Sequence, residues 1–417
     1  MIINMKYKKE CKEFRKRLKN GHQKISKDLI QSHKRKIIKK AISRINTTSK
    51  SLYKRTYEGV NKQFPENVHT RTNIYGNRRV IQIIFKTKGC RMKKAGSCWN
   101  CNYGAAEIIE LNHNKIIQEY RKKLEELSGD VLVLESFGSI TDAKEFDKGL
   151  FKEVIKIAIQ ESRFNTILIE THMNHISQDL IEYIDELNRG KKNLGFEVGI
   201  EDMNPENRKL INKIGIDNEK LFKLYQMLEK YGMQLNINLI YGFPFMTEKE
   251  RIDSTYESVR EISKKMPNAP IVLFLMSIKE NTYLEEMNKK GQFTLPNPWG
   301  FVELCHRIIS DEKIENLITF SWFGEKEDLY VKDYNCYTCT TCKDQIIEAL
   351  KRINGTFDLE ERRSFLSELI EYGKQSDCSC LSEFRESLKF DDGKVPNKRY
   401  YEFMLKVAFE NGNKFIR

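Results

Sequence analysis

The sequence predicts an α/β fold, a partial (β/α)6 barrel, with a basic helical arm before it and a cysteine-rich metal-binding domain after it. Between residues 80 and 280, short apolar runs rich in β-branched residues alternate with amphipathic segments of helical period. Near-continuous apolar runs are typical of parallel strands that are covered on both faces. In addition, eight of the ten cysteines fall in two clusters, at 90–101 and 336–380, which indicates two metal sites.

Six apolar runs are expected to form the barrel strands. They are VIQIIFKT (80–87), VLVLESFG (131–138), TILIETH (166–172), FEVGIED (196–202), LNINLIYGF (235–243) and IVLFLMSI (271–278). The helical segments between them are expected to make right-handed crossovers. A doubly wound open sheet is the alternative. No glycine-rich phosphate-binding fingerprint follows the first run, which argues against a nucleotide site of the Rossmann type.

Polar and small residues gather where these runs end. A cysteine loop follows the first run, and the later ends carry Ser139, Asp142, Glu170, Thr171, His172, Glu201, Asp202, Gly242 and Pro244. In β/α barrels the chemistry takes place at the C-terminal ends of the strands. We therefore expect the functional site at this end of the barrel.

The 417 residues divide into three expected regions: a basic helical arm (1–60), the β/α core (70–310) and a cysteine-rich accessory domain (325–417). No apolar stretch approaches the roughly 20 residues of a membrane span. The first residues lack the apolar stretch of a secretory signal. We therefore expect a cytoplasmic protein without a membrane partner, whose clustered cysteines bind metal rather than form disulfides.

Positive charge is concentrated in the arm. Residues 1–55 contain 19 Lys and Arg and three acidic residues, a net charge of +16, whereas the rest of the chain has a net charge of −3. A basic segment on a near-neutral body is typical of proteins that bind a phosphate backbone. A solvated, lysine-rich terminal helix is the alternative interpretation.

The first cysteine cluster has the spacing Cys90-x7-Cys98-x2-Cys101 and follows the first strand directly. Soft thiolates favour iron–sulfur clusters or zinc over hard cations. Three cysteines can hold three irons of a [4Fe–4S] cluster and leave the fourth iron open to another ligand. A structural zinc site, or thiols that are unrelated, would be the alternative.

Five motifs carry a resemblance to a known family: GCRMKKAGSCWNCNYG, SFGSITD, ETHMNHI, VGIEDMNPENRKLINKIG and LIYGFPFMTEKE. With them the chain resembles the radical S-adenosylmethionine (SAM) superfamily. Within it the chain looks most like the radical subunit of archaeosine synthase (RaSEA), and more distantly like the Elongator-type radical core. The resemblance covers roughly residues 70–385. The commonest motif of the superfamily has three residues between its first two cysteines, whereas this chain has seven, which points to a subset of the superfamily.

The resemblance implies two cofactors, a [4Fe–4S] cluster on Cys90, Cys98 and Cys101 and SAM on the open iron. It also implies a one-electron reductant as partner and a 5′-deoxyadenosyl radical that abstracts hydrogen from the substrate. Further positions are matched to cofactor contacts. Gly138 and Ser139 would lie near the methionine amino group of SAM, and Glu170 and Glu201 would contact cofactor or substrate. Gly242 and Pro244 would shape the part of the site that binds adenine. Trp99 and Tyr103 would cover the cluster or the adenine. The resemblance assigns no catalytic residue.

The second cluster contains Cys336, Cys339, Cys342, Cys378 and Cys380, one more thiol than a tetrahedral zinc site uses. The radical subunit of archaeosine synthase is similar here, with an Asn-Cys-x2-Cys element and a later Cys-x-Cys. We favour zinc. An auxiliary iron–sulfur cluster is the rival interpretation, and disulfides are the weaker third one.

Three functions compete. The first is a radical SAM enzyme that modifies tRNA, bound through the basic arm, by cleaving a carbon–nitrogen bond of a lysine-adducted 7-deazaguanine. The second is a radical SAM enzyme that acts on a peptide or small metabolite, since a shared core does not transfer substrate identity. The third is a non-catalytic, zinc-bearing RNA-binding protein.

Overall fold

The structure is a computed structural model that describes residues 66–75, 78–102, 110–244, 246–279, 282–289, 293, 295–321, 331–333 and 339–389. Several sequence-based expectations fall outside these residues. They are the basic helical arm (1–60), the cofactor candidate Tyr103, the metal ligand candidate Cys336, and the end of the accessory domain (390–417).

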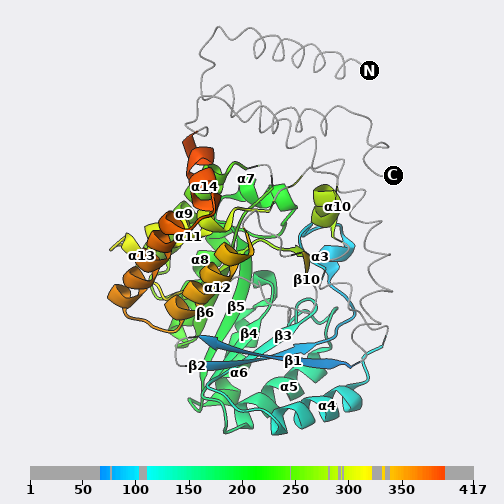
Figure 1. Cartoon of the computed structure of the whole chain (residues 1–417). Helices are drawn as coiled ribbons and strands as arrows, with labels where there is room; N and C mark the ends of the chain where they lie inside the picture. The colour runs from blue at the N-terminus through cyan, green and yellow to red at the C-terminus, as the bar shows by residue number, and fades with distance from the viewer. Residues whose placement is uncertain are drawn as a thin grey trace, which may run out of the picture.

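A curled sheet of eight strands forms a half-barrel at the centre of the molecule (Figure 1). Its order is β1-β2-β3-β4-β5-β6-β7-β9. β1 runs antiparallel to β2, and every later neighbour is parallel. The strands are β1 (Val68–Tyr75), β2 (Arg78–Phe85), β3 (Val131–Ser136), β4 (Thr166–Glu170), β5 (Asn193–Glu201), β6 (Gln234–Tyr241), β7 (Ile271–Leu275) and β9 (Ile318–Ser321). β8 (Ile278–Lys279) and β10 (Val331–Asp333) pair separately.

The partial barrel predicted from the sequence is confirmed, and all six expected runs form its parallel strands β2 to β7. Two further strands lie at the edges of the sheet. β1 has a polar, alternating sequence, VHTRTNIY, and β9 has only four residues, ITFS. Neither stretch has the long apolar run by which the other strands are recognised.

Helices cover the convex face of the sheet (Figure 1). Those of the β/α units are α4 (His113–Glu125), α5 (Lys148–Gln160), α6 (Gln178–Asn188), α8 (Asn218–Lys230), α9 (Glu248–Lys265) and α11 (Pro298–Ser310). Each begins at a side chain that accepts a hydrogen bond from a backbone amide of its first turn, as expected of N-caps. These caps are Asn112, Asp147, Ser177, Asp217, Thr247 and Asn297.

Short helices lie near the C-terminal end of the barrel. They are α3 (Arg91–Lys94), α7 (Pro205–Arg208), the 3-10 helices η2 (Met173–His175) and η3 (Lys209–Ile211), and α10 (Tyr283–Lys289). α3 belongs to the cysteine loop, and the backbone of α10 contacts it, because the Leu284 amide donates to the Trp99 carbonyl at 3.2 Å. This end of the barrel is therefore built from loops that follow several different strands.

Three C-terminal helices pack against the barrel on the side of β9 (Figure 1). They are α12 (Thr340–Asn354), α13 (Leu359–Gln375) and α14 (Cys380–Lys389). Their buried side chains, such as Ile346 and Phe384, belong to the same hydrophobic core as the barrel strands. Gly373 of α13 lies so close to the buried Trp299 ring that a Cβ atom there would collide with it.

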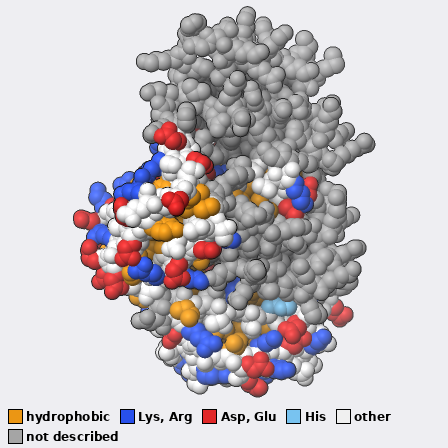
Figure 2. Space-filling model, in the orientation of Figure 1, with side chains coloured by type: hydrophobic (Ala, Val, Ile, Leu, Met, Phe, Trp, Pro, Cys, Tyr) orange, Lys and Arg blue, Asp and Glu red, His pale blue; other side chains and the backbone are white. Residues whose placement is uncertain are grey.

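Lys and Arg side chains are interspersed with Asp and Glu over the described part of the face in Figure 2. Among the described helices, none is both long and apolar enough to cross a membrane.

Candidate metal centres and the barrel cavity

A cavity of about 710 Å³ fills the concave side of the half-barrel and extends from the N-terminal to the C-terminal ends of the strands. Its lining includes several polar side chains, among them Glu135, Glu170 and Glu197. The three cysteines Cys90, Cys98 and Cys101 line its C-terminal end. The structure thus brings the predicted cluster ligands to the predicted end of the strands.

The cysteine loop is held against the segment that follows β5. The Cys98 amide donates to the Asn212 carbonyl at 3.2 Å, and the Trp99 amide donates to the Ile211 carbonyl at 2.9 Å. The Asn212 side chain donates back to the Gly96 carbonyl at 3.0 Å, and the Ser97 hydroxyl donates to the Asn212 carbonyl. These bonds fix the backbone at and around Cys98 without using its sulfur atom.

Three non-glycine residues around this contact have left-handed backbones: Cys98 (φ 52°), Glu201 (φ 68°) and Asn212 (φ 52°). Such conformations cost roughly 1–3 kcal/mol each and persist where the surroundings impose them, which is common at functional sites. Backbone strain is therefore concentrated where the cysteine loop meets the ends of β5 and η3.

Two buried lysines lie beside the cysteine thiols. Lys93 is 2% exposed, and its ammonium donates to the Cys98 carbonyl at 3.4 Å. Lys213 forms an ion pair of 2.7 Å with Glu201. Burial opposes the charged form of Lys213, but Glu201 and the thiols of Cys98 and Cys101 raise its pKa further than burial lowers it.

Burial disfavours the thiolate form of Cys90 and Cys98. It raises the pKa of Cys90 to about 12, and the charges of Glu145 and Cys98 add to this. It also raises the pKa of Cys98, although Lys213 acts in the opposite direction. Metal binding requires thiolates. Three partly buried thiols therefore fit a metal cluster, whose irons would favour their deprotonated form, and the two lysines beside them would offset the negative charge of the thiolates.

A second contact connects the cysteine loop to the turn after β3. The Glu145 carboxylate accepts the Ser139 amide and the Arg91 amide, both at 2.6 Å. A Cβ atom on Gly138 would collide with this carboxylate. Gly138 and Ser139 both line the cavity. The glycine at position 138 is thus explained by the close approach of Glu145, which was not predicted from the sequence.

The other cofactor candidates differ in placement. Glu170 and Glu201 line the cavity. Trp99 is fully buried, with its ring centre 5.3 Å from that of Tyr283, and is not among the described residues that line the cavity. Gly242 (φ 114°) and Pro244 are buried at the end of β6, where Gly242 packs against Pro296, and they too lie outside the described lining.

Several other polar residues that line the cavity were not identified from the sequence. They are Glu135, Glu197, Asn236, Asn238, Lys213 and Lys279. A signal was available, because polar residues at alternate positions of otherwise apolar runs, such as QLNINLIY in β6, mark one face of a strand. These side chains all project from β strands or adjacent loops toward the concave face.

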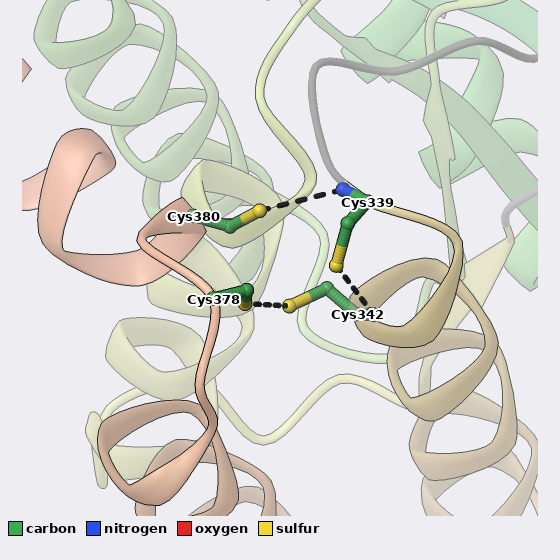
Figure 3. Close-up of side chains that lie close together, drawn as sticks. All are labelled: Cys339, Cys342, Cys378 and Cys380. Atoms are coloured by element: carbon green, nitrogen blue, oxygen red, sulfur yellow. Dashed lines mark hydrogen bonds between the residues drawn. The ribbon is translucent and has the colours of Figure 1, made fainter.

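The second cysteine cluster converges at the start of α12 and the start of α14 (Figure 3). The donor atoms of Cys339, Cys342, Cys378 and Cys380 all lie within 4.8 Å of one another. The sulfurs of Cys342 and Cys378 are 3.1 Å apart. The Cys339 sulfur accepts the Cys342 amide at 3.4 Å, and the Cys380 sulfur accepts the Cys339 amide at 3.3 Å.

The chemistry of the second cluster suits a metal ion. The Ser376 hydroxyl and the Cys342 thiol lower the pKa of Cys378 to about 6 by hydrogen bonding. Burial, together with hydrogen bonds to Cys378 and Cys339, raises the pKa of Cys342. Four cysteines at this spacing provide a complete tetrahedral set of ligands, without Cys336.

Comparison with known proteins agrees with this geometry. Residues 84–258 match the family described as the radical SAM superfamily. This stretch begins at the end of β2, includes all three cysteines of the first loop, and ends within α9. Residues 84–258 therefore carry a radical SAM domain, the class of domain that holds an iron–sulfur cluster.

The chain is similar to two archaeal proteins over most of its length. It is 26% identical over 350 residues to an uncharacterised protein of Methanocaldococcus jannaschii, covering 79% of this chain and 90% of that protein. It is 22% identical over 323 residues to archaeosine synthase subunit beta of Methanosarcina acetivorans, covering 75% of this chain and 86% of that subunit.

Among solved structures, the chain is similar to Elp3 of Methanocaldococcus infernus with residues 1–46 deleted (TM-score 0.37, 21% identity, 50% of each chain). The chain thus spans about half the length of that Elp3 structure. It is also similar to methylornithine synthase (TM-score 0.40, 14% identity, 76% of this chain and 91% of that chain).

Proposed function

We propose that Cys90, Cys98 and Cys101 hold a [4Fe–4S] cluster with SAM at its open iron, and that the substrate reacts in the half-barrel cavity. The observation that carries this proposal is the position of the three thiols at the C-terminal end of a cavity of about 710 Å³. When bound, the cluster and SAM supply a 5′-deoxyadenosyl radical that removes hydrogen from a carbon of the substrate. The protein holds the ligands and excludes water.

Within this site, Gly138 and Ser139 form the turn beside the cluster loop, and Glu145 fixes that turn to the loop. The pair of Lys213 and Glu201 provides one positive and one negative group at the cavity surface. An amino acid moiety such as the methionine of SAM carries both charges, so this pair complements it. Glu170 lies deeper and is a candidate for contact with the substrate.

For the second cluster we propose a structural zinc ion on Cys339, Cys342, Cys378 and Cys380. A Zn–S distance of about 2.3 Å places the sulfurs of a tetrahedral site about 3.8 Å apart. Donor atoms that all lie within 4.8 Å fit one ion. An auxiliary cubane would put each thiolate on a different iron and thus hold the sulfurs farther apart. On this assignment Cys336 is the surplus thiol.

The substrate we propose is tRNA that carries a lysine-adducted 7-deazaguanine, converted by cleavage of a carbon–nitrogen bond. Support comes from the similarity to archaeosine synthase subunit beta over most of both chains. Charge provides the second argument, because residues 1–55 contain the whole positive excess and the described surface in Figure 2 mixes both signs. The arm is therefore the candidate for contact with the tRNA backbone.

The tRNA proposal is tested by binding and turnover with the full chain. One variant replaces Lys34, Arg35, Lys39, Lys40 and Arg44 of the arm by Gln. Its control replaces five exposed lysines on the outer helices, Lys156, Lys220, Lys223, Lys230 and Lys264. We expect the arm variant alone to lose tRNA affinity and to show a shallower dependence of binding on salt, by up to about 0.9 in the log–log slope per lost phosphate contact.

Turnover separates the competing substrates. We expect anaerobic enzyme with reductant to consume lysine-adducted tRNA and to release 5′-deoxyadenosine and methionine. Equal loss of tRNA affinity in both five-residue variants would show that the arm has no special role. Consumption of a peptide or metabolite, with adducted tRNA left intact, would overturn the tRNA assignment and retain the radical SAM one.

A further inference from the structure

Two glutamates face each other in the middle of the cavity. Glu170, the last residue of β4, and Glu197 of β5 are partners in the parallel register of these strands, and both line the cavity. Neighbouring strands are about 4.8 Å apart, so side chains on one face at the same level are in reach of each other. Like charges directly opposite each other on neighbouring strands are destabilising. The fold thus maintains an arrangement that costs stability.

No described residue neutralises this pair by direct contact. Within the described part of the chain, neither Glu170 nor Glu197 forms an ion pair, and the Glu170 carboxylate makes no hydrogen bond. Burial raises the pKa of Glu170, the charges of Glu135 and Glu197 raise it further, and Lys279 acts in the opposite direction. The other nearby lysine, Lys213, is engaged by Glu201.

An independent feature beside the glutamates indicates what kind of ligand they bind. Asn238 of β6 lines the cavity and is 7% exposed. Its amide nitrogen donates to Glu197 Oε1 at 2.8 Å, which fixes the orientation of the amide group. Its Oδ1 has no hydrogen-bond partner in the described part of the chain. A buried acceptor without a donor costs free energy, so this oxygen is matched to a donor that comes with a ligand.

We propose that Glu170, Glu197 and Asn238 form a binding site for a cationic amine of the substrate, within the cavity of the radical SAM enzyme proposed above. An ammonium group carries three hydrogen-bond donors and no acceptor. It complements two carboxylates and one amide oxygen, and it removes the repulsion between the two glutamates. The lysine moiety of the proposed tRNA adduct carries such a group, and so does a lysine in a peptide or a free diamine.

A metal ion is a poorer match. Among the described residues, three or more His, Cys, Asp or Glu ligand atoms come within 4.8 Å of one another only at the cysteines of the second cluster. The carboxylates of Glu135, Glu170 and Glu197 therefore do not form a three-carboxylate site for one metal ion.

The test uses n-pentylammonium as the probe and 1-pentanol as its neutral counterpart, with binding to the full-length, cluster-loaded protein followed by saturation-transfer NMR. We expect the amine to bind and the alcohol to bind at least tenfold more weakly. Glu170→Gln, Glu197→Gln and Asn238→Ala should each weaken amine binding by about tenfold or more. The control Glu206→Gln, in an exposed ion pair with Lys209, should leave it unchanged.

Thermal unfolding shows whether a variant that loses amine binding is still folded. Because each Glu→Gln substitution removes repulsion, we expect their unfolding midpoints without ligand to equal or exceed that of the unsubstituted protein. Three outcomes would overturn the inference. They are a lowered unfolding midpoint of the Glu→Gln variants, amine binding that is unchanged by all three substitutions, and equal binding of the alcohol and the amine.

The same preparations are assayed for iron and for the effect of SAM on the cluster spectrum. A SAM-responsive cluster without amine binding would overturn this inference and leave the proposed function intact. Amine binding in protein that forms no cluster would support the cation site and contradict the radical function.

Discussion

Lys213 Nζ lies 2.7 Å from Glu201 Oε1 at the end of the barrel that carries the cysteine loop. Both side chains are largely buried, 12% and 13% exposed, and both line the cavity. Glu201 has a left-handed backbone, and Lys213 follows Asn212, which holds the loop through Gly96. The ion pair therefore joins the end of β5 to the segment on which the cluster loop rests.

Breaking this ion pair should be costly. Lys213→Met leaves the Glu201 carboxylate buried without its cation, and loss of one partner of a buried pair typically costs 3–5 kcal/mol, about 3 here. The double variant Lys213→Met/Glu201→Leu should recover part of that loss. Denaturant unfolding of the four proteins in a double-mutant cycle measures the coupling. Additive effects of the two substitutions would show that the pair contributes nothing.

Gly138→Ala should displace the Glu145 carboxylate, because the added Cβ would collide with it. Overpacking of this kind typically costs about 1–3 kcal/mol, and here it also breaks the bonds from Ser139 and Arg91 to Glu145. In a Glu145→Ala background the same substitution should have little further effect. Unfolding midpoints and iron content of the single and double variants check this. A full extra loss in the double variant would mean that Glu145 is not the obstacle.

Removal of one ligand should empty the second metal site without affecting the first. Cys342→Ser should lose one equivalent of zinc and destabilise the α12–α14 region, since metal binding contributes directly to the stability of such regions. Cys336→Ser serves as the matched control and should retain the zinc. Metal analysis with far-ultraviolet circular dichroism measures both effects. If iron disappears in place of zinc, the site holds an auxiliary cluster.

Substitution of Glu170 should change how stability depends on pH. Burial, then Glu135, Glu197 and Glu201, raise its pKa, and Lys279 lowers it. A carboxyl whose pKa is raised on folding weakens the folded state once pH exceeds its unfolded value. Glu170→Gln should therefore stabilise the ligand-free protein at pH 7 and lose that advantage at acidic pH. Unfolding midpoints between pH 4 and 8 follow the effect, and a constant difference across this range would contradict it.

The sequence alone predicted the parallel strands β2 to β7 well, because each is an apolar run rich in β-branched residues and long enough to be distinct. It missed β1 and β9, whose sequences VHTRTNIY and ITFS carry no such run. The location of the site at the C-terminal ends of the strands was also predictable, since loops that follow parallel strands meet at one end of the sheet. The three cysteines accordingly line the cavity there.

Contacts between distant segments were not predictable. The role of Glu145 depends on the turn after β3 and the cysteine loop meeting in space. The pairing of Glu170 with Glu197 depends on the register between β4 and β5, which the pattern of apolar residues does not specify. Trp99 shows that proximity in the sequence can also mislead. It lies next to the cluster cysteines in the sequence, but its ring packs against Tyr283 and is not among the described residues that line the cavity.

We propose that Cys90, Cys98 and Cys101 hold a cluster that binds SAM, and this is the first point to test. The most direct measurement is electron paramagnetic resonance of the anaerobically reconstituted, reduced protein with and without SAM, beside the Cys90→Ala/Cys98→Ala/Cys101→Ala variant. We predict a [4Fe–4S] signal that SAM alters and that the triple variant lacks, while zinc at the second site is retained. Two results would contradict this assignment. One is a protein that binds zinc alone, and the other is a cluster signal that is still present in the triple variant and that SAM does not change.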